Sequence, residues 1–322
     1  MQLPLITVII PTYNYAHLIT QAIDSVFSQD YPADKMEIVI VDDGSKDNTE
    51  DVVASLQEKR IRFYYQENAG KAVATARAIE LAKGKYIFNL DADDYYLAGK
   101  IRKTVEIFEA HPDVVHIGNP ALIIWEEEDR EKVEPIPEQL LDKVLDGEEL
   151  NTYFLENNML FGGGSTYAVR AAVAKQLEIT PAVNLYIDEF LITGILPFGD
   201  AYLFKEALSV WRVHGKNYSG KRRTKEAIIK RDQLLLSCSK GTLEQLAKID
   251  AMPKRLLRLY EFKHQMRIIS AQEKAGTKSL GDILQFFLHF TFKNPQPVRV
   301  LNKYKAFNRL LPLFFQKLLK RA

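Results

Sequence analysis

Carboxylates gather in one short stretch of the chain, Asp91-Ala92-Asp93-Asp94. The stretch follows Tyr86–Phe88, an apolar run typical of a buried strand, so it stands at the carboxyl end of that strand. Ligands bind at this end of the strands in open α/β sheets. Crowded carboxylates repel one another unless a cation joins them, and Mg²⁺ or Mn²⁺ bridged to substrate phosphates is the usual cation. The alternative interpretation is an Asp-rich turn that caps the next helix.

Alternating strands and helices must position this stretch. Apolar, β-branched runs predict strands at 5–10, 37–41, 61–65 and 86–88. Helical patterns lie between them at 19–26, from 49 through Lys59, and from Gly70 to Lys83, where Gly84 is expected at the C′ position. Short connections between such elements predict a parallel sheet with right-handed crossovers. We therefore expect an α/β fold, Rossmann-like, with a mostly parallel central sheet and flanking helices.

The loops after these strands are expected on one edge of the sheet. They carry an aromatic side chain, carboxylates suited to a ribose or a base, and an arginine, which together with a metal suit a nucleoside diphosphate. Each residue also has a purely structural interpretation as a packed ring, a turn or a solvated charge. The residues are Pro11, Tyr13, Asn14, Asp42, Asp43, Asn68, Gly70 and Arg77.

Four motifs in this order resemble those of family-2 glycosyltransferases of the GT-A fold: 11–14, 41–45, 68–70 and 91–94. The resemblance covers about residues 5–220. It implies a metal-dependent, inverting transfer of a sugar from a nucleoside diphosphate, UDP favoured, to a hydroxyl of a glycan or lipid-linked acceptor. It places the metal at Asp93, and the nucleotide at Pro11, Thr12, Tyr13, Asn14, Asp42, Asp43, Asn68, Gly70, Arg77, Asp91 and Ala92. The family often follows its helix arginine with Asn and Gly, whereas Ala78 follows Arg77 here.

The next part of the chain supplies a glycine-rich segment. Strands are expected at 114–117 and 121–125, a charged excursion at 126–129, and helices around 138–145 and 149–157. Glycines 162–164 precede Ser165 and let the backbone approach a ligand closely. By resemblance, Gly163, Gly164 and Ser165 line the donor-sugar and acceptor side of the site.

A pair of acidic residues, Asp188 and Glu189, stands at the start of a predicted helix, where negative charge also favours the helix dipole. An inverting transfer needs a carboxylate to take the proton of the acceptor hydroxyl. We favour Asp188 as this catalytic base because Leu191 keeps the family's Asp-x-x-Leu spacing. Glu189 is the alternative.

A predicted strand at 208–213 leads to His214. The segment resembles the family's Tyr-Arg-x-His, whose His often lies at the metal or the diphosphate, so His214 joins Asp93 as a predicted metal residue. Trp211 and Arg212 are assigned to the donor and acceptor side, and Arg212 or Lys216 also suits a phosphate. A structural histidine is the alternative.

Two domains are expected: residues 1–220 as the catalytic domain and 221–322 as a helical C-terminal region. Beyond Gly281 this region is rich in Phe, Leu and basic residues, which suits a helix lying in a membrane interface. A helical hairpin packed on the catalytic domain and a contact between subunits of a homo-oligomer are the alternatives.

Composition narrows the function classes. The 322 residues are 47% hydrophobic, as in a globular protein, and 43 Lys+Arg balance 42 Asp+Glu, which gives no electrostatic case for nucleic acid. A single cysteine, Cys238, fits a reducing compartment. With no evident signal peptide and no apolar run near the ~20 residues of a membrane span, we expect a cytoplasmic protein, including the cytoplasmic face of the membrane.

Two other functions fit parts of the pattern. A sugar nucleotidyltransferase would need a Gly-rich phosphate loop after the first strand, where Pro11–Asn14 stands instead. A non-catalytic nucleotide-sugar-binding protein would not need the carboxylates at Asp91, Asp93 and Asp188. Processive synthases of the family carry Gln-x-x-Arg-Trp and membrane helices, and neither is seen, so addition of a single sugar is favoured.

Overall fold

The computed structural model describes residues 3–160, 163–215 and 225–275, together with 281, 289, 300 and 303. The chain divides into two compact units. One contains Met1–Glu148 and Phe161–Lys221, and the other contains Glu149–Leu160 and Arg222–Ala322. The α/β elements belong to the first unit, which carries every candidate site residue.

The first unit is built on a mixed eight-stranded sheet in the order β3-β2-β1-β4-β10-β6-β11-β9. Strands β3, β2, β1 and β4 are parallel, as the sequence predicts, and β11 is parallel to β6. Strand β10 is antiparallel to both β4 and β6, and β9 is antiparallel to β11. The strands are β1 (Ile6–Thr12), β2 (Met36–Asp42), β3 (Ile61–Tyr65), β4 (Tyr86–Asn89), β6 (Val114–Gly118), β9 (Val144–Leu145), β10 (Tyr167–Arg170) and β11 (Asp200–Leu203).

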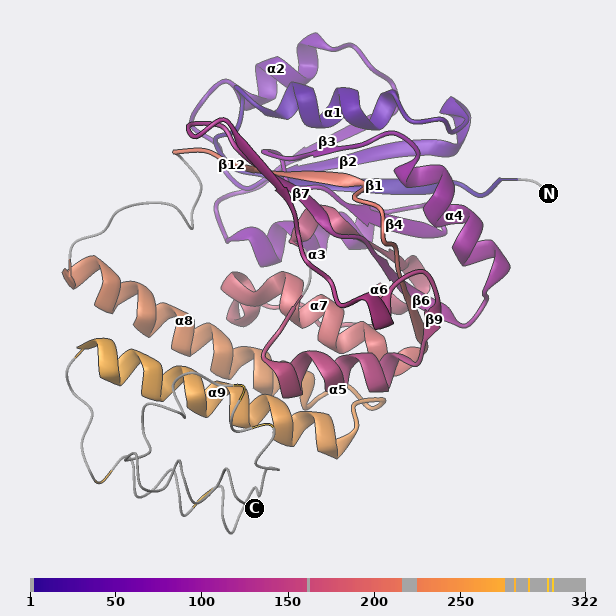
Figure 1. Ribbon diagram of the computed structural model, residues 1–322. Helices are drawn as coiled ribbons and strands as arrows, with labels where there is room; N and C mark the ends of the chain where they lie inside the picture. The colour runs from indigo at the N-terminus through magenta and orange to yellow at the C-terminus, as the bar shows by residue number, and fades with distance from the viewer. Residues whose placement is uncertain are drawn as a thin grey trace. The chain divides into compact units, whose positions relative to one another are not determined.

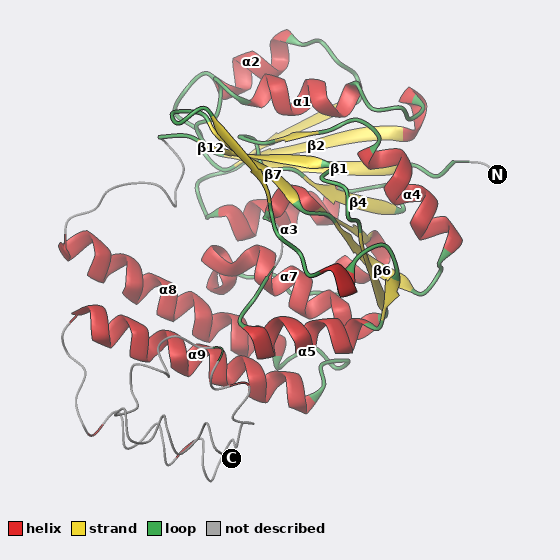
Figure 2. Cartoon of the chain, viewed as in Figure 1, coloured by secondary structure: helices red, strands yellow, loops and turns green. Residues whose placement is uncertain are grey.

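Helices cover both faces of this sheet (Figures 1 and 2). Helices α1 (Ile19–Phe27), α2 (Thr49–Ser55) and α4 (Lys100–Ala110) pack on one face, and α3 (Lys71–Leu81) packs on the other. Every residue of β1 and β2 is buried, which explains their continuous apolar sequence. The apolar positions of α1 predicted at helical spacing all enter the core: Ile19, Ala22, Ile23 and Val26.

A second, four-stranded sheet has the order β5-β12-β7-β8. Its strands are β5 (Tyr95–Tyr96), β7 (Ala121–Trp125), β8 (Arg130–Val133) and β12 (Ser209–Val213). The charged excursion at 126–129 is the turn of the β7–β8 hairpin. The remaining elements are α5 (Gly147–Asn157), α6 (Ala171–Ala174), α7 (Ile187–Ile195) and the 3₁₀ helices η1 (Ala33–Lys35), η2 (Glu138–Leu140), η3 (Gly164–Thr166), η4 (Pro181–Tyr186) and η5 (Leu196–Phe198).

Three local predictions were wrong. The segment 138–145 is not a helix but η2 followed by β9, because Asp142 adopts a positive φ of 52° and its N–H pairs with Leu203 O near β11. Helix α2 ends at Ser55, before Lys59, and Gln57 has φ +49°. Gly84 is not a left-handed helix cap: a Cβ there would lie 2.4 Å from the backbone N of Thr7, so glycine is needed where the chain passes against β1.

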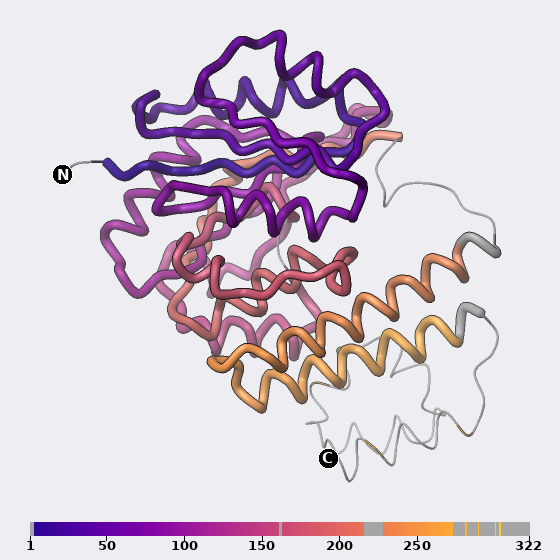
Figure 3. The backbone as a smooth tube through the Cα atoms, turned by 180° about the vertical axis from the view of Figure 1, so that it is seen from behind, coloured from indigo at the N-terminus to yellow at the C-terminus, as the bar shows by residue number. Residues whose placement is uncertain are grey.

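The second unit contains two long helices, α8 (Lys225–Leu246) and α9 (Lys254–Ala275), as the helical pattern predicts. They run side by side (Figure 3) and are joined by a buried hydrogen bond, in which Ser239 Oγ lies 3.0 Å from His264 Nδ1. No helix among the described residues is long and apolar enough to cross a membrane. The Phe- and Leu-rich segments at 284–290 and 310–315 lie outside the described residues, apart from residue 289.

Candidate active site

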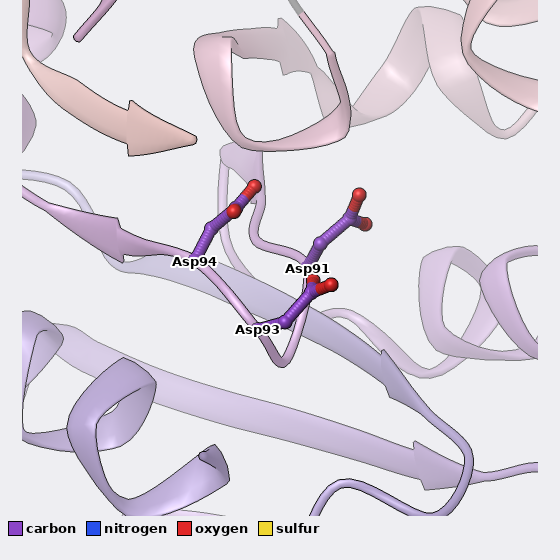
Figure 4. A group of neighbouring side chains, drawn as sticks. All are labelled: Asp91, Asp93 and Asp94. Carbon is purple, nitrogen blue, oxygen red and sulfur yellow. The ribbon is translucent and has the colours of Figure 1, made fainter. Parts of the chain in front are cut away.

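The acidic stretch forms a tight turn between β4 and β5. The N–H of Asp94 donates to Asp91 O over 3.0 Å, and one oxygen from each of Asp91, Asp93 and Asp94 then lies within 4.8 Å of the others (Figure 4). The Asp94 carboxylate is buried and accepts hydrogen bonds from Ser165 Oγ at 2.6 Å and Arg212 N at 3.0 Å. Burial raises the pKa of Asp94 well above its usual value, and the charges of Asp93 and Asp91 add to the rise. Asp94 therefore anchors the turn, while Asp91 and Asp93 remain the more accessible carboxylates.

Strand β12 brings His214 to this turn. His214 Nε2 lies 3.3 Å from Asp93 Oδ2, and the ring of Tyr15 meets the His214 ring edge-on at 6.2 Å. Burial raises the pKa of Tyr15, helped by the charge of Asp93 and by the hydrogen bond that the Tyr15 hydroxyl donates to Asp93. Arg212 Nε donates to Asp93 O, and its guanidinium also donates to Gln21 Oε1 at 2.7 Å. The structure thus unites the two predicted metal residues, Asp93 and His214, although 121 positions separate them.

The candidate base is joined to the turn through a lysine. Lys71 Nζ lies 2.8 Å from Asp91 Oδ1 and 3.3 Å from Asp188 Oδ2, and Tyr167 donates its hydroxyl to Asp188 Oδ1 over 3.2 Å. Burial raises the pKa of Asp188 and Asp91 adds to this, while Lys71 opposes it. Burial alone would lower the pKa of Lys71, but the attraction of Asp188 and Asp91 raises it instead. The residue is therefore a charged ammonium between two carboxylates.

The geometry distinguishes Asp188 from Glu189. Adjacent residues of a helix point about 100° apart, so the two side chains lie on different sides of α7. Asp188 is the one that contacts Lys71 and Tyr167, whereas Glu189 is buried with 7% of its surface exposed.

The loops after β1 and β2 are joined by hydrogen bonds on the same edge of the sheet. Asp42 Oδ1 accepts from Ser45 N at 2.8 Å, and Ser45 Oγ accepts from Asn14 N at 2.7 Å. Tyr13 beside them is 42% exposed, and the Thr12 hydroxyl is buried without a hydrogen-bond partner among the described residues. A ring open to solvent and an unpartnered hydroxyl suit the predicted nucleoside site.

Asp43 orders the following loop. Its carboxylate accepts from Ala69 N at 2.9 Å and Gly70 N at 2.8 Å, and its backbone oxygen accepts from Asn68 Nδ2 at 2.8 Å. A carboxylate held this way shapes the β3–α3 loop. Ala92 is buried in the core, within the acidic turn.

Two further predicted site residues lie on α3 and β12. Arg77 donates to Tyr65 O at 2.9 Å and to Gln66 Oε1 at 3.4 Å, and Gln66 in turn donates to Asp43 Oδ1 at 2.8 Å, so Arg77 is joined to the predicted nucleoside loops. Trp211 is 39% exposed and adjoins Arg212 on β12. Because side chains alternate along a strand, Trp211 faces away from the acidic turn that Arg212 contacts.

The glycine-rich segment packs directly on the turn. A Cβ on Gly164 would lie 2.7 Å from Asp91 Oδ1 and 2.7 Å from Asn89 Nδ2, whereas a Cβ on Gly163 would meet nothing within 4 Å. Ser165 then accepts a hydrogen bond from Asp91 N at 3.0 Å. Gly164 is therefore required for the close approach to Asp91, and Gly162 lies outside the described residues.

The order of these motifs agrees with a family model. The model described as glycosyl transferase family 2 matches residues 7–177, more than half of the chain. The chain belongs to glycosyltransferase family 2. The match covers the acidic turn, the loops after β1 and β2, and β10, and it stops before Asp188 and His214.

Two further comparisons agree with this family. An uncharacterized glycosyltransferase of Nostoc sp. is 33% identical over 219 residues, and the aligned part covers 66% of this chain and 66% of that relative, just under two thirds of its length. The structure of Staphylococcus aureus TarS in complex with UDP covers 96% of this chain and 81% of its own, with TM-score 0.58 and 16% identity. A mannosyltransferase of Pyrobaculum calidifontis, in complex with GDP-Man and Mn²⁺, covers 96% and 86%, with TM-score 0.57 and 21% identity. These likenesses show a GT-A-like fold.

The residues present fit a hard divalent cation. Asp91 and Asp93 offer carboxylate oxygens, and the raised pKa of Asp94 beside them reflects burial and an excess of negative charge. Oxygen ligands of this kind suit Mg²⁺ or Mn²⁺, and an imidazole such as His214 is compatible with Mn²⁺. Asp91, Asp93 and Asp94 each offer one oxygen to such a group, and His214 Nε2 lies 3.3 Å from Asp93 Oδ2.

Sequence reasoning missed several residues of the site. Lys71 directly follows the Asn68-Ala69-Gly70 motif at the first position of α3, which was a usable signal because α3 begins at the carboxyl edge of the sheet. Tyr15 adjoins Asn14, and Tyr167 comes two positions after Ser165. Asn184, whose Oδ1 accepts from Ala72 N at 3.0 Å, gave no local signal because it lies in η4, far along the chain from α3.

Proposed function

We propose that this family-2 protein is a metal-dependent, inverting glycosyltransferase that moves a single sugar from a nucleoside-diphosphate sugar, with UDP favoured, to a hydroxyl of a glycan or lipid-linked acceptor. The observation that carries the proposal is the Asp91–Lys71–Asp188 bridge, which sets a candidate base beside the acidic turn. The ligands of similar structures support the donor class, since TarS was solved with UDP and with UDP-GlcNAc, and the Pyrobaculum enzyme with GDP-Man and Mn²⁺.

The donor would lie along the carboxyl edge of the parallel strands. Tyr13 offers an exposed ring for the base, and Asp42 and Asn14 stand at the ends of the neighbouring loops. Asp93 and His214 would hold Mn²⁺ or Mg²⁺, which when bound supplies positive charge to the departing diphosphate. The backbone of Gly164 lies against Asp91 and closes this side of the site.

Asp188 would act on the acceptor. The acceptor hydroxyl oxygen attacks the anomeric carbon, the bond from that carbon to the diphosphate oxygen breaks, and the hydroxyl proton moves to a carboxylate oxygen of Asp188. Attack opposite the leaving group inverts the configuration. Tyr167 fixes the orientation of Asp188 through its hydroxyl, so Tyr167 is a positioning residue.

Nucleotide release tests the proposal. The full chain is incubated with UDP-glucose, UDP-GlcNAc and GDP-mannose, with Mn²⁺, with Mg²⁺ or with EDTA, and UDP or GDP is measured. We expect release from at least one donor that depends on the metal. Pyrophosphate release from a nucleoside triphosphate and a sugar phosphate would identify a nucleotidyltransferase instead, and donor binding without turnover on an acceptor panel would favour a binding protein.

A further inference from the structure

Lys71 has a position that the metal and the base do not explain. It is the first residue of the 11-residue helix α3, directly after Gly70, and its side chain is 36% exposed. Its ammonium contacts both oxygens of Asp91, at 2.8 and 2.9 Å, and Asp188 Oδ2 at 3.3 Å. The residue thus brings a positive charge, together with the positive end of a helix dipole, to the centre of an acidic site.

We propose that Lys71 binds the diphosphate of the donor, and that in doing so it releases Asp188 to receive the acceptor. The inference rests on the proposed function and adds a ligand-binding role for this residue. A lysine carries a compact charge on a flexible stem with three rotatable donors. Lys71 can therefore keep its contact with Asp91 while a phosphate oxygen replaces its contact with Asp188.

The lengths of the two contacts indicate which one exchanges. The contact with Asp188 is 3.3 Å, whereas those with Asp91 are 2.8 and 2.9 Å, within the usual range for a charge-assisted hydrogen bond. The longer contact is the weaker, so a phosphate competes more readily with Asp188 than with Asp91.

The consequence for Asp188 is an order of events. In the structure both of its oxygens are engaged, Oδ1 by the Tyr167 hydroxyl and Oδ2 by Lys71. Each carboxylate oxygen can accept a second hydrogen bond, so an acceptor hydroxyl can still reach Asp188, but the neighbouring ammonium stabilises the carboxylate and weakens it as a base. Departure of Lys71 toward a diphosphate removes that charge from Oδ2, so Asp188 becomes the stronger base once the donor is in place.

A purely structural role, in which Lys71 only neutralises Asp91 and Asp188, makes a different prediction. If the role is structural, removal of Lys71 distorts the whole site and weakens the binding of nucleoside monophosphates and diphosphates equally. If Lys71 instead binds the diphosphate, its removal weakens the binding of nucleoside diphosphates and leaves the binding of monophosphates unchanged. Comparison of UDP with UMP, and of GDP with GMP, separates the two roles.

Calorimetry on the full chain provides the test, with each nucleotide titrated in Mn²⁺ and in EDTA. We expect Lys71→Met to weaken UDP or GDP binding at least about tenfold, as for loss of a hydrogen bond to a charged group, and to change UMP or GMP binding less than twofold. Lys71→Arg should retain most of the preference for the diphosphate. Lys83→Met, an exposed lysine beyond the other end of α3, is the matched control and should bind as the wild type does.

Asp188→Asn supplies a second arm that does not depend on the fold of the Lys71 variant. Loss of the competing carboxylate charge frees Lys71, so Asp188→Asn should bind UDP or GDP more tightly, by about threefold. The same change in a Lys71→Met background should have no such effect. Non-additivity of this kind is what a shared contact produces.

The outcomes separate this inference from the proposed function. Equal losses for monophosphate and diphosphate in Lys71→Met, or no loss in either, would overturn the role of Lys71 while metal-dependent turnover by the wild type upholds the transferase. If the wild type binds neither UDP nor GDP in Mn²⁺, the proposed function fails and this inference falls with it.

Discussion

Replacement of Asp188 by asparagine isolates the proton-accepting step. Asparagine has nearly the same shape, and its side-chain oxygen can still accept the Tyr167 hydroxyl that lies 3.2 Å from Asp188 Oδ1. The substitution removes the negative charge that Lys71 faces at 3.3 Å and the basicity that an acceptor proton requires. Chemistry should therefore suffer while the nucleotide site keeps its form.

The size of the loss follows from what a general base contributes. Proton transfer to a positioned side chain is worth about 10²- to 10⁴-fold in rate, and each tenfold corresponds to about 1.4 kcal/mol of barrier. Asp188→Asn should thus lower kcat by 10²- to 10⁴-fold, roughly 3–5 kcal/mol. Donor binding should not weaken, because Lys71 remains in place.

Steady-state release of UDP or GDP gives kcat, and calorimetry on the same preparation gives donor affinity. Glu189→Gln is the matched control, one position along α7 and on a different side of the helix, and it should keep kcat within about fivefold of the wild type if the protein remains folded. A kcat for Asp188→Asn within tenfold of the wild type would remove Asp188 from the mechanism. If only Glu189→Gln loses kcat, while its thermal stability stays that of the wild type, Glu189 is the base.

Three other predictions address the metal, the glycine segment and the core. His214→Ala should weaken Mn²⁺-dependent UDP binding at least about tenfold and leave binding in EDTA unchanged; equal affinity across a metal titration would contradict a metal role. Gly164→Ala, whose Cβ would lie 2.7 Å from Asp91 Oδ1, should lower metal-dependent donor affinity at least about tenfold, whereas Gly163→Ala, with nothing within 4 Å, should not; similar effects of the two would refute the close-packing argument. Burial lowers the pKa of His116 to about 4 from 6.5, aided by Lys100. His116 therefore takes up a proton near pH 6.5 in the unfolded chain but only near pH 4 in the folded chain. The free energy of unfolding should fall as the pH drops from 6.5 to 4, by about 3 kcal/mol in total. Urea unfolding at several pH values measures this loss, and His116→Gln should reduce it; an unchanged pH profile in that variant would exclude His116 as the source.

Much of the first unit could be predicted from local patterns. Continuous apolar runs marked β1, β2 and β4, and helical spacing marked α1, because both signals arise within a few neighbouring residues. The position of Asp93 at the end of a parallel strand and the delivery of His214 by a later strand followed from the same logic.

What the sequence did not disclose depends on contacts between distant residues. Lys71 and Asp188 are 117 positions apart, and only the packed fold shows that they meet. Strand β10 runs antiparallel because Ser165, just before it, is tied to the acidic turn at the carboxyl edge, so the strand has to start there. Trp211 and Arg212 are both predicted on the donor and acceptor side, and alternation along β12 places their side chains on opposite faces of the strand.

The reversed direction of β10 couples two parts of the chemistry mechanically. Ser165, just before this short strand, holds Asp94 of the acidic turn, and Tyr167, its first residue, holds Asp188. A lengthening of the chain between Ser165 and Tyr167 by one residue would turn Tyr167 to the opposite side of the sheet and disconnect the two. Homologous chains should therefore have no insertion between the residues that match Ser165 and Tyr167, even where the surrounding loops vary in length.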